Sequence, residues 1–357
     1  NAALSGTSDE LVVNLHGVSD PSSTDDSKSG IVLTRAAGAT NDLETVKLVS
    51  SSIANVLETF DGTAVDVTTL KIAGDQAFTL VDTLDTEVTT VDGGDATAAL
   101  TFTTGAVAAT ITTGTGDDTI TAGSAGDTIT SGDGADSVTG GGGADSVISG
   151  AGADTIVLSG GNNDTISAGS GADTITSATG NDSIDAGADN DTINLTAAGL
   201  TSEDTVDGGT GTDILHFSAV GSSADADFTN VTNIETLNTT DVTTGATTLV
   251  LGTEAAEAGI ATINSQSDGT ADSITIQAGF TNALTINLDQ TDAQAADGVT
   301  IDASAFTKNL TLNAGILTFI NNVTHQAGSG TADVLRFNGT SNTTAASIDV
   351  TNFETFE

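Results

Sequence analysis

A single aliphatic residue recurs about every nine positions across residues 113–216, and a glycine-rich polar stretch separates each one from the next. The residue before it is Ser or Thr in every copy except the last. Such a unit predicts a three-residue strand, with one inward side chain between two outward ones, joined to a six-residue turn. The aliphatic residues are Ile120, Ile129, Val138, Val147, Ile156, Ile166, Ile175, Ile184, Ile193, Val206 and Leu215.

An aspartate lies two positions before each aliphatic residue, at the sixth position of the nine-residue unit. Eight of the ten steps between successive aspartates are nine residues long, one is ten, and one is thirteen. Aspartates can simply favour turns, but eleven copies in a fixed relation to an aliphatic residue argue against that explanation. The aspartates are Asp118, Asp127, Asp136, Asp145, Asp154, Asp164, Asp173, Asp182, Asp191, Asp204 and Asp213.

Glycine occupies the second position in nine units and the fourth position in seven. It permits a sharp turn and leaves the backbone carbonyls open to a ligand. At the fourth position, Ala125, Asn162, Asp189 and Ser202 depart from the pattern. The glycines that we expect to contribute to the site are Gly114, Gly116, Gly123, Gly132, Gly134, Gly141, Gly143, Gly150, Gly152, Gly169, Gly171, Gly180, Gly209 and Gly211.

One aliphatic side chain in nine residues cannot close a hydrophobic core by itself. Two units per coil, about 18 residues, can do so, because stacked coils place two rows of Ile and Val face to face from two parallel sheets. The sequence therefore predicts an all-β fold with a parallel β-roll over residues 113–216. Stacking also divides the aspartates into two rows, one on each side, with five gaps between neighbours in one row and four in the other.

The flanks predict further β-structure. Short alternating strands recur every 10 to 15 residues, for example at 273–277 (SITIQ) and 283–288 (ALTINL), with Asn, Asp and Gly between them. We expect β-solenoid or β-sandwich segments with little helix, at most a turn or two at 254–260. The domains are then an N-terminal β-rich segment (1–112), the roll (113–216) and a C-terminal β-rich segment (217–357), which we expect to continue in a longer protein.

The charge balance requires cations. The chain has 49 Asp and Glu residues, 6 Lys and Arg residues and a net charge of −43, and no Lys or Arg lies between Lys71 and Lys308. Salt bridges inside the protein therefore cannot neutralise the aspartate rows. A nucleic acid or an anionic membrane is disfavoured as a partner, because both need a basic face. No apolar run reaches the length of a membrane span.

The aspartate rows predict calcium sites. In stacked turns, carboxylates and backbone carbonyls from two coils can converge on one point, and six or so oxygen ligands in a flexible arrangement suit Ca²⁺ better than Mg²⁺. One ion in each gap gives roughly nine Ca²⁺ ions, which would reduce the net charge from −43 to about −25. A single aspartate would then serve the two gaps beside it. Cysteine ligands are excluded because the chain has no Cys.

The nonapeptide block resembles the RTX repeat, the glycine- and aspartate-rich calcium-binding nonapeptide of secreted bacterial proteins. The resemblance covers residues 113–216 and implies a parallel β-roll, calcium-triggered folding outside the cell and export by a type I system. The flanks resemble RTX-type surface-layer proteins of Gram-negative bacteria such as that of Caulobacter, through their Thr, Ala, Asn and Gly content and their N-[IF]-E-T-[LF] elements, at 233–237 and 352–356. That resemblance implies a calcium-dependent lattice anchored on lipopolysaccharide.

We therefore expect an extracellular structural protein of the cell surface that assembles with itself, contacting lipopolysaccharide through a region outside this stretch. An RTX adhesin and the calcium-binding part of a secreted hydrolase or toxin are the alternatives. No enzyme is expected here: there is no HExxH or GxSxG motif, and His16, His216 and His325 are isolated in the sequence. An ice-binding face is not expected, because the third and fifth positions of the units form no continuous row of Thr or Asn.

Overall fold

A computed structural model describes most of the central part of the chain and shorter stretches of both flanks. The described residues are 10–15, 30–32, 43–61, 66–195, 199–218, 221–240, 247–266, 273–288, 300–315, 324–326, 329–330, 333–338, 349–351 and 355–356. The chain divides into two compact units, residues 1–175 and 176–357. This division does not test the domain boundaries expected from the sequence, which stay a prediction.

The first unit is a parallel β-solenoid with two main sheets whose strands alternate along the chain. Its first sheet contains β1 (Glu10–Leu15), β3 (Thr45–Ser50), β6 (Thr69–Gly74), β8 (Thr90–Ala96), β10 (Thr110–Thr112), β12 (Thr128–Asp133), β14 (Ser146–Ala151) and β16 (Thr165–Ser170). Its second sheet contains β4 (Asn55–Leu57), β7 (Phe78–Leu80), β9 (Leu100–Thr103), β11 (Thr119–Thr121), β13 (Ser137–Gly141) and β15 (Thr155–Leu158). A small sheet pairs β2 (Gly30–Val32) with β5 (Thr59–Asp61), and β17 (Thr174–Thr176) lies at the boundary between the units.

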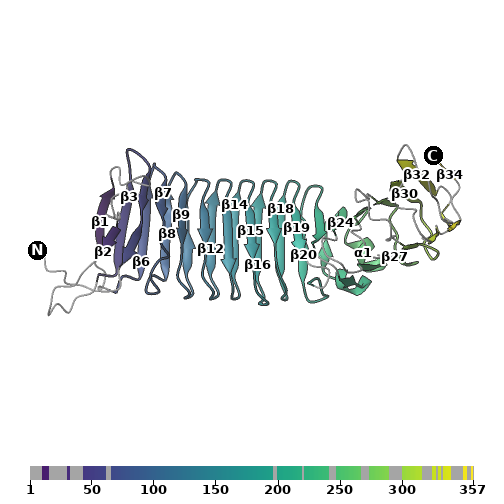
Figure 1. Cartoon of the computed structure of the whole chain (residues 1–357), viewed down its shortest axis with the longest axis horizontal. Helices are drawn as coiled ribbons and strands as arrows, with labels where there is room; N and C mark the ends of the chain where they lie inside the picture. The colour runs from purple at the N-terminus through teal and green to yellow at the C-terminus, as the bar shows by residue number, and fades with distance from the viewer. Residues whose placement is uncertain are drawn as a thin grey trace, which may run out of the picture. The chain divides into compact units, whose positions relative to one another are not determined.

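Strand register confirms a coil of two nonapeptides. Thr119 of β11 pairs with Ser137 of β13, 18 residues later, and Ser137 pairs with Thr155 of β15. Consecutive units therefore enter opposite sheets, and alternate units stack directly, as the strands around β12 and β14 show in Figure 1. This stacking places alternate aspartates of the sequence in the same row.

The second unit is also built from parallel strands. One sheet contains β18 (Ser183–Ala188), β20 (Thr205–Asp207) and β23 (Val231–Thr232). Another contains β19 (Thr192–Leu195), β21 (Ile214–Phe217), β24 (Thr236–Thr240), β26 (Thr262–Gln266), β28 (Leu284–Leu288), β30 (Leu310–Gly315), β32 (Val334–Asn338) and β34 (Thr355–Phe356). The third contains β22 (Ser222–Ser223), β25 (Thr248–Leu251), β27 (Ser273–Ile276), β29 (Thr300–Asp302), β31 (Thr324–Gln326) and β33 (Asp349–Thr351).

Helix is scarce, as expected. The described residues contain one short α-helix, α1 (Thr253–Glu257), and one 3₁₀ turn, η2 (Asp225–Phe228). No helix in the described stretches is long and apolar enough to cross a membrane. In the flanks the parallel pairing of strands, for example β26 with β28, identifies the β-solenoid alternative rather than a sandwich.

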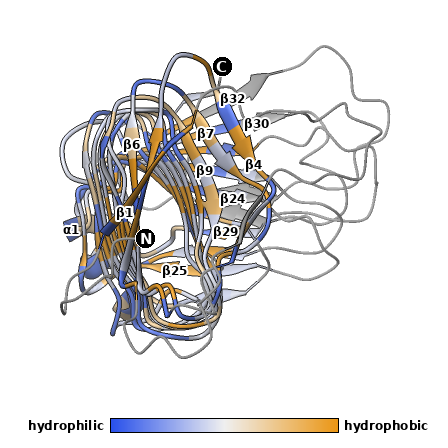
Figure 2. Cartoon of the chain, turned by 90° about the vertical axis from the view of Figure 1, so that its left-hand side faces the viewer, coloured by the Kyte–Doolittle hydropathy of each residue, from blue (hydrophilic) through white to orange (hydrophobic). Residues whose placement is uncertain are grey.

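The core is the stack of inward aliphatic side chains that the nine-residue period predicts. All eleven are at most 2% exposed. Their strand neighbours at the seventh and ninth positions point outward, as in β11, where Ile120 is buried between an exposed Thr119 and a half-buried Thr121. Figure 2 shows hydrophobic residues in orange along strands such as β7 and β9. The same period that builds the core fixes where each aspartate lies.

Candidate metal centre

The eleven aspartates of the nonapeptides are buried, each with at most 5% of its surface exposed. Each lies at the end of a turn, directly before the outward Ser, Thr or Ile that begins its short strand. A carboxylate is almost never buried without a partner. Each aspartate therefore needs a hydrogen-bond donor, a proton or a cation.

In nine of the eleven units, Oδ1 of the aspartate accepts a hydrogen bond from the backbone of the preceding coil. Oδ1 of Asp136 accepts the N–H of Asp118 at 2.8 Å, and Oδ1 of Asp154 accepts the N–H of Asp136 at 2.8 Å. The same bond recurs at 2.7 to 2.8 Å from Leu100 to Asp118, Ala109 to Asp127, Asp127 to Asp145, Asp145 to Asp164, Asp154 to Asp173, Asp182 to Asp204 and Asp191 to Asp213. These charge-assisted bonds hold the carboxylates of each row in a fixed position.

The second carboxylate oxygen, Oδ2, is the one available to a cation. In six of the units, Oδ2 is buried and accepts no hydrogen bond of regular geometry. A buried anionic oxygen without a donor has a desolvation cost of several kcal/mol, so these atoms mark the places where a cation fits. The six residues are Asp118, Asp127, Asp136, Asp145, Asp154 and Asp213.

The pKa values of these carboxyl groups reflect the same desolvation cost. Burial raises the pKa of all six above the usual value. For Asp136 it reaches about 6, because burial acts together with the charges of Asp118 and Asp154. For Asp145 it also reaches about 6, again through burial first and then through its row neighbours. Like charges close together in a dry site need a counter-ion.

The glycines of the turns permit close stacking of the coils. Gly150 at the second position has φ +105°, and a Cβ there would lie 2.0 Å from the carbonyl oxygen of Gly132 in the preceding coil. No larger residue fits between the two backbones. Second-position carbonyls also accept backbone hydrogen bonds from the next coil, as Gly114 does from Asp133 at 3.0 Å. The role of the glycine carbonyls as ligands stays a prediction.

Two units that depart from the glycine pattern differ in their consequences. Asp189 keeps the left-handed conformation of the glycine that it replaces, with φ +81°. In the unit with Ser202 at the fourth position, Oδ2 of Asp204 accepts the N–H of Thr201 at 2.7 Å and its hydroxyl at 3.0 Å. Both oxygens of Asp204 are therefore hydrogen-bonded inside the chain, and this carboxylate is a poor candidate ligand.

A divalent, oxygen-preferring cation fits the donor set. The described residues contain no group of three or more His, Cys, Asp or Glu side chains close enough to hold an ion. An ion in these rows would combine carboxylates of neighbouring coils with backbone oxygens, which is the chemistry of Ca²⁺. Within the first unit, the open Oδ2 atoms of Asp118, Asp127, Asp136, Asp145 and Asp154 would hold the ions. In the second unit, Asp213 would do so.

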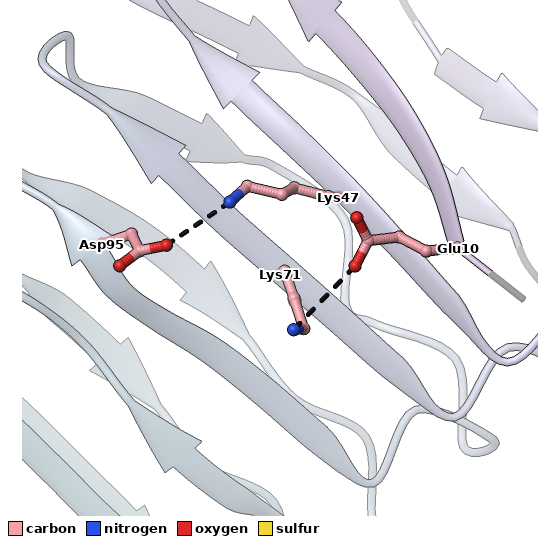
Figure 3. Close-up of polar contacts among 4 residues, drawn as sticks. All are labelled: Glu10, Lys47, Lys71 and Asp95. Carbon is pink, nitrogen blue, oxygen red and sulfur yellow. Dashed lines mark hydrogen bonds and ion pairs between the residues drawn. The ribbon is translucent and has the colours of Figure 1, made fainter. Parts of the chain in front are cut away.

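In the described residues, Lys47, Lys71 and His216 interact with groups outside these rows. Lys47 forms a salt bridge with Asp95 at 3.3 Å and Lys71 with Glu10 at 3.9 Å, on strands β1, β3, β6 and β8 (Figure 3). His216 lies on β21, where its Nδ1 is 2.8 Å from Oδ1 of Asn194 and burial lowers its pKa. His16 and the side chain of His325 lie outside the described part of the chain.

The sequence analysis missed two carboxylates that belong to this pattern, Glu235 and Asp333. Asp333 is buried directly before β32, and its Oδ1 accepts the N–H of Leu310 at 2.8 Å. Glu235 lies directly before Thr236 and Leu237 of β24, and its Oε2 accepts the N–H of Asp213 at 2.8 Å. The signal was present, because Glu235-Thr236-Leu237 copies the carboxylate, hydroxyl and aliphatic order of the nonapeptide. The analysis also missed a hydroxyl at the first position: Ser177 donates to Oδ2 of Asp182 at 2.6 Å.

Comparison with known protein families finds the RTX calcium-binding nonapeptide repeat. Its model matches four times, at residues 104–138, 121–156, 158–193 and 196–219. These repeats bind calcium, and they fit a β-roll with several Ca²⁺ ions. Neither the curated proteins nor the solved structures contain a significant match. The repeats indicate an extracellular calcium-binding protein, because proteins that carry them are typically secreted.

Proposed function

We propose that this chain is part of an extracellular structural protein that assembles with itself, in the presence of calcium, into a layer on the cell surface. The repeats support the calcium dependence and the extracellular location. No catalytic role is proposed. The partners are further copies of the protein and, through a region outside these residues, lipopolysaccharide.

One observation carries the proposal of self-assembly. In the described residues, β1 is the terminal strand of its sheet, and Leu11 and Val12 on it are 38% and 49% exposed. A terminal strand with exposed apolar side chains is a template for pairing with another chain. A second copy that adds a strand there would extend the parallel stack from one molecule to the next. Calcium would act by holding the coils in register.

Electron microscopy of the full chain tests this proposal. We expect ordered sheets or filaments in millimolar Ca²⁺ and none in chelator. Val12→Lys places a charge on the terminal strand and should abolish the assemblies. Ile53→Lys changes a side chain that is 53% exposed elsewhere and should leave them intact. Assemblies that form equally well from both variants would show that β1 is not the contact, and a chain that stays monomeric in calcium would contradict the lattice.

An adhesin is the second candidate, and one observation favours it. Outward Ser and Thr residues at the seventh position stack in register along the sheet, as Thr119, Ser137 and Thr155 do. Such a row of hydroxyl groups offers hydrogen bonds to a glycan or another polar surface. A protein that stays monomeric in calcium and binds glycans would support the adhesin. A catalytic domain in the full-length gene would instead indicate the calcium-binding part of a hydrolase or toxin.

A further inference from the structure

The ladder of carboxylate-to-backbone bonds continues beyond the last nonapeptide. Glu235 follows Asp213 by 22 residues, the same distance that separates Asp213 from Asp191. Oε2 of Glu235 accepts the N–H of Asp213 at 2.8 Å, as Oδ1 of Asp213 accepts the N–H of Asp191 at 2.8 Å. The strands continue in register as well, with Leu215 beside Leu237. Glu235 therefore occupies the sixth position of one more coil.

An open buried oxygen lies between these two coils. Asp213 is fully buried, and its Oδ2 has no hydrogen-bond partner. A Cβ on Gly208 would lie 3.0 Å from this Oδ2 and 2.1 Å from the backbone carbonyl oxygen of Asn233. A carboxylate oxygen and a carbonyl oxygen therefore both lie next to Gly208, where an added Cβ would overlap the carbonyl oxygen. Neither oxygen can stabilise the other, because both are acceptors.

A third carboxylate adds negative charge nearby. Oδ1 of Asp207 accepts the N–H of Gly209 at 3.0 Å and the side-chain amide of Asn233 at 2.7 Å, so Asp207 ties the turn before β21 to the turn before β24. Burial, followed by the charges of Glu235 and Asp207, raises the pKa of Asp213. No Lys or Arg lies within 70 residues of this turn on either side of the sequence. A cation from solution would neutralise this cluster.

We propose that Asp213, Glu235 and the backbone carbonyl of Asn233 hold a divalent cation of the calcium type, at a site where the last nonapeptide meets the first coil of the C-terminal flank. All its donors are oxygen atoms, two of them from carboxylates, which favours Ca²⁺ over metals that prefer nitrogen or sulfur. The site fixes the first coil of the C-terminal flank onto the last nonapeptide. It rests on calcium binding by the repeats and is independent of lattice formation.

Calcium stoichiometry of the full chain tests the site. Glu235→Gln retains an oxygen that can accept the N–H of Asp213 but removes the charge. We expect this variant to bind one Ca²⁺ ion fewer per chain than the wild type in equilibrium dialysis. Glu257→Gln, which makes the same change at an exposed position of α1, should bind the full number. If Glu235→Gln and the wild type bind equal numbers with equal affinity, Glu235 only caps the backbone and the proposal is wrong.

A second measurement avoids any dependence on the folding of a variant. Crystals of the wild-type protein grown in calcium should give an anomalous calcium peak beside Oδ2 of Asp213, between the coils of Asp213 and Glu235. Peaks in the repeats without a peak at this position would overturn this proposal but not calcium binding by the repeats. No calcium peak anywhere would contradict this proposal and also calcium binding by the repeats. Neither result depends on whether the protein forms a lattice.

Discussion

Oδ1 of Asp145 accepts the backbone N–H of Asp127, which precedes it by 18 residues, at 2.8 Å. This bond fixes successive carboxylates of a row at the spacing of stacked strands, about 5 Å. At that separation two charges repel by about 3 kcal/mol at an effective dielectric constant of about 20. The hydrogen bonds that organise the row therefore also concentrate its charge, and the row needs cations between its members.

Chelation of calcium should unfold the nonapeptide block, residues 113–216. Without the ions, the row charges repel and the buried Oδ2 atoms accept no hydrogen bond of regular geometry, so the loss should extend along the rows rather than stay at one turn. Circular dichroism in excess EGTA measures the loss of β-structure, and added calcium should restore it. A spectrum that does not change in EGTA would contradict this prediction.

Asp145→Asn should weaken the binding of two calcium ions, because one carboxylate serves the gap on each side of its coil. The amide oxygen can still accept the N–H of Asp127, so the backbone bond survives while the charge is lost. We expect affinity at the two sites to fall about tenfold or more, equivalent to about 1.4 kcal/mol each. Calorimetric titration against the wild type measures the change. Weakening of only one ion would exclude shared ligation.

Asp204→Asn is the matched control for this substitution. Both oxygens of Asp204 already accept hydrogen bonds from the chain, from Asp182 and Thr201. The variant should bind as many calcium ions as the wild type, while the lost acceptor for Thr201 lowers the free energy of unfolding by about 1 to 3 kcal/mol. A loss of calcium in this variant would mean that the ion displaces these hydrogen bonds.

The sequence predicts the repeat and its core well because both follow from one short period. Each inward side chain, such as that of Ile120, is buried by its own coil and the coils above and below. The local sequence pattern therefore also determines the tertiary contacts. The burial of Asp136 and its place in a row follow from the same period. In the flanks the coil length varies, and the sequence leaves a solenoid and a sandwich both open until strand pairing is known.

Other features of the site could not be predicted from the period. Oδ2 of Asp204 has a hydrogen-bond donor because Thr201 lies beside it. Thr201 belongs to the thirteen-residue step between Asp191 and Asp204, which departs from the nine-residue repeat. The place of Glu235 depends on a coil that has lost the glycine signature and replaced Asp by Glu. In both cases the decisive fact is which backbone N–H faces a carboxylate, and this requires the stacked structure.

Low pH should stabilise the calcium-free chain. The pKa values of Asp136 and Asp145 rise from 3.8 to about 6 on folding. Between these values the folded chain binds protons that the unfolded chain does not, so the free energy of unfolding falls as the pH rises through about 4 to 6. Circular dichroism in calcium-free buffer should therefore show more β-structure at pH 5 than at pH 7.5. The double variant Asp136→Asn, Asp145→Asn should show a smaller difference, and an equal difference would assign the effect to other carboxylates.

Gly150→Ala should disrupt the stacking of coils, whereas Gly142→Ala should not. Gly150 has φ +105° and its Cβ would overlap the carbonyl oxygen of Gly132 at 2.0 Å, so both the backbone conformation and the space exclude a side chain. The strained conformation alone costs about 1 to 3 kcal/mol, and the displaced coil adds to it. At Gly142 the nearest atom to a Cβ is 3.7 Å away and φ is not in the left-handed region. Calcium-dependent refolding followed by circular dichroism should require more calcium for Gly150→Ala and the wild-type concentration for Gly142→Ala, and equal behaviour of the two variants would refute close stacking.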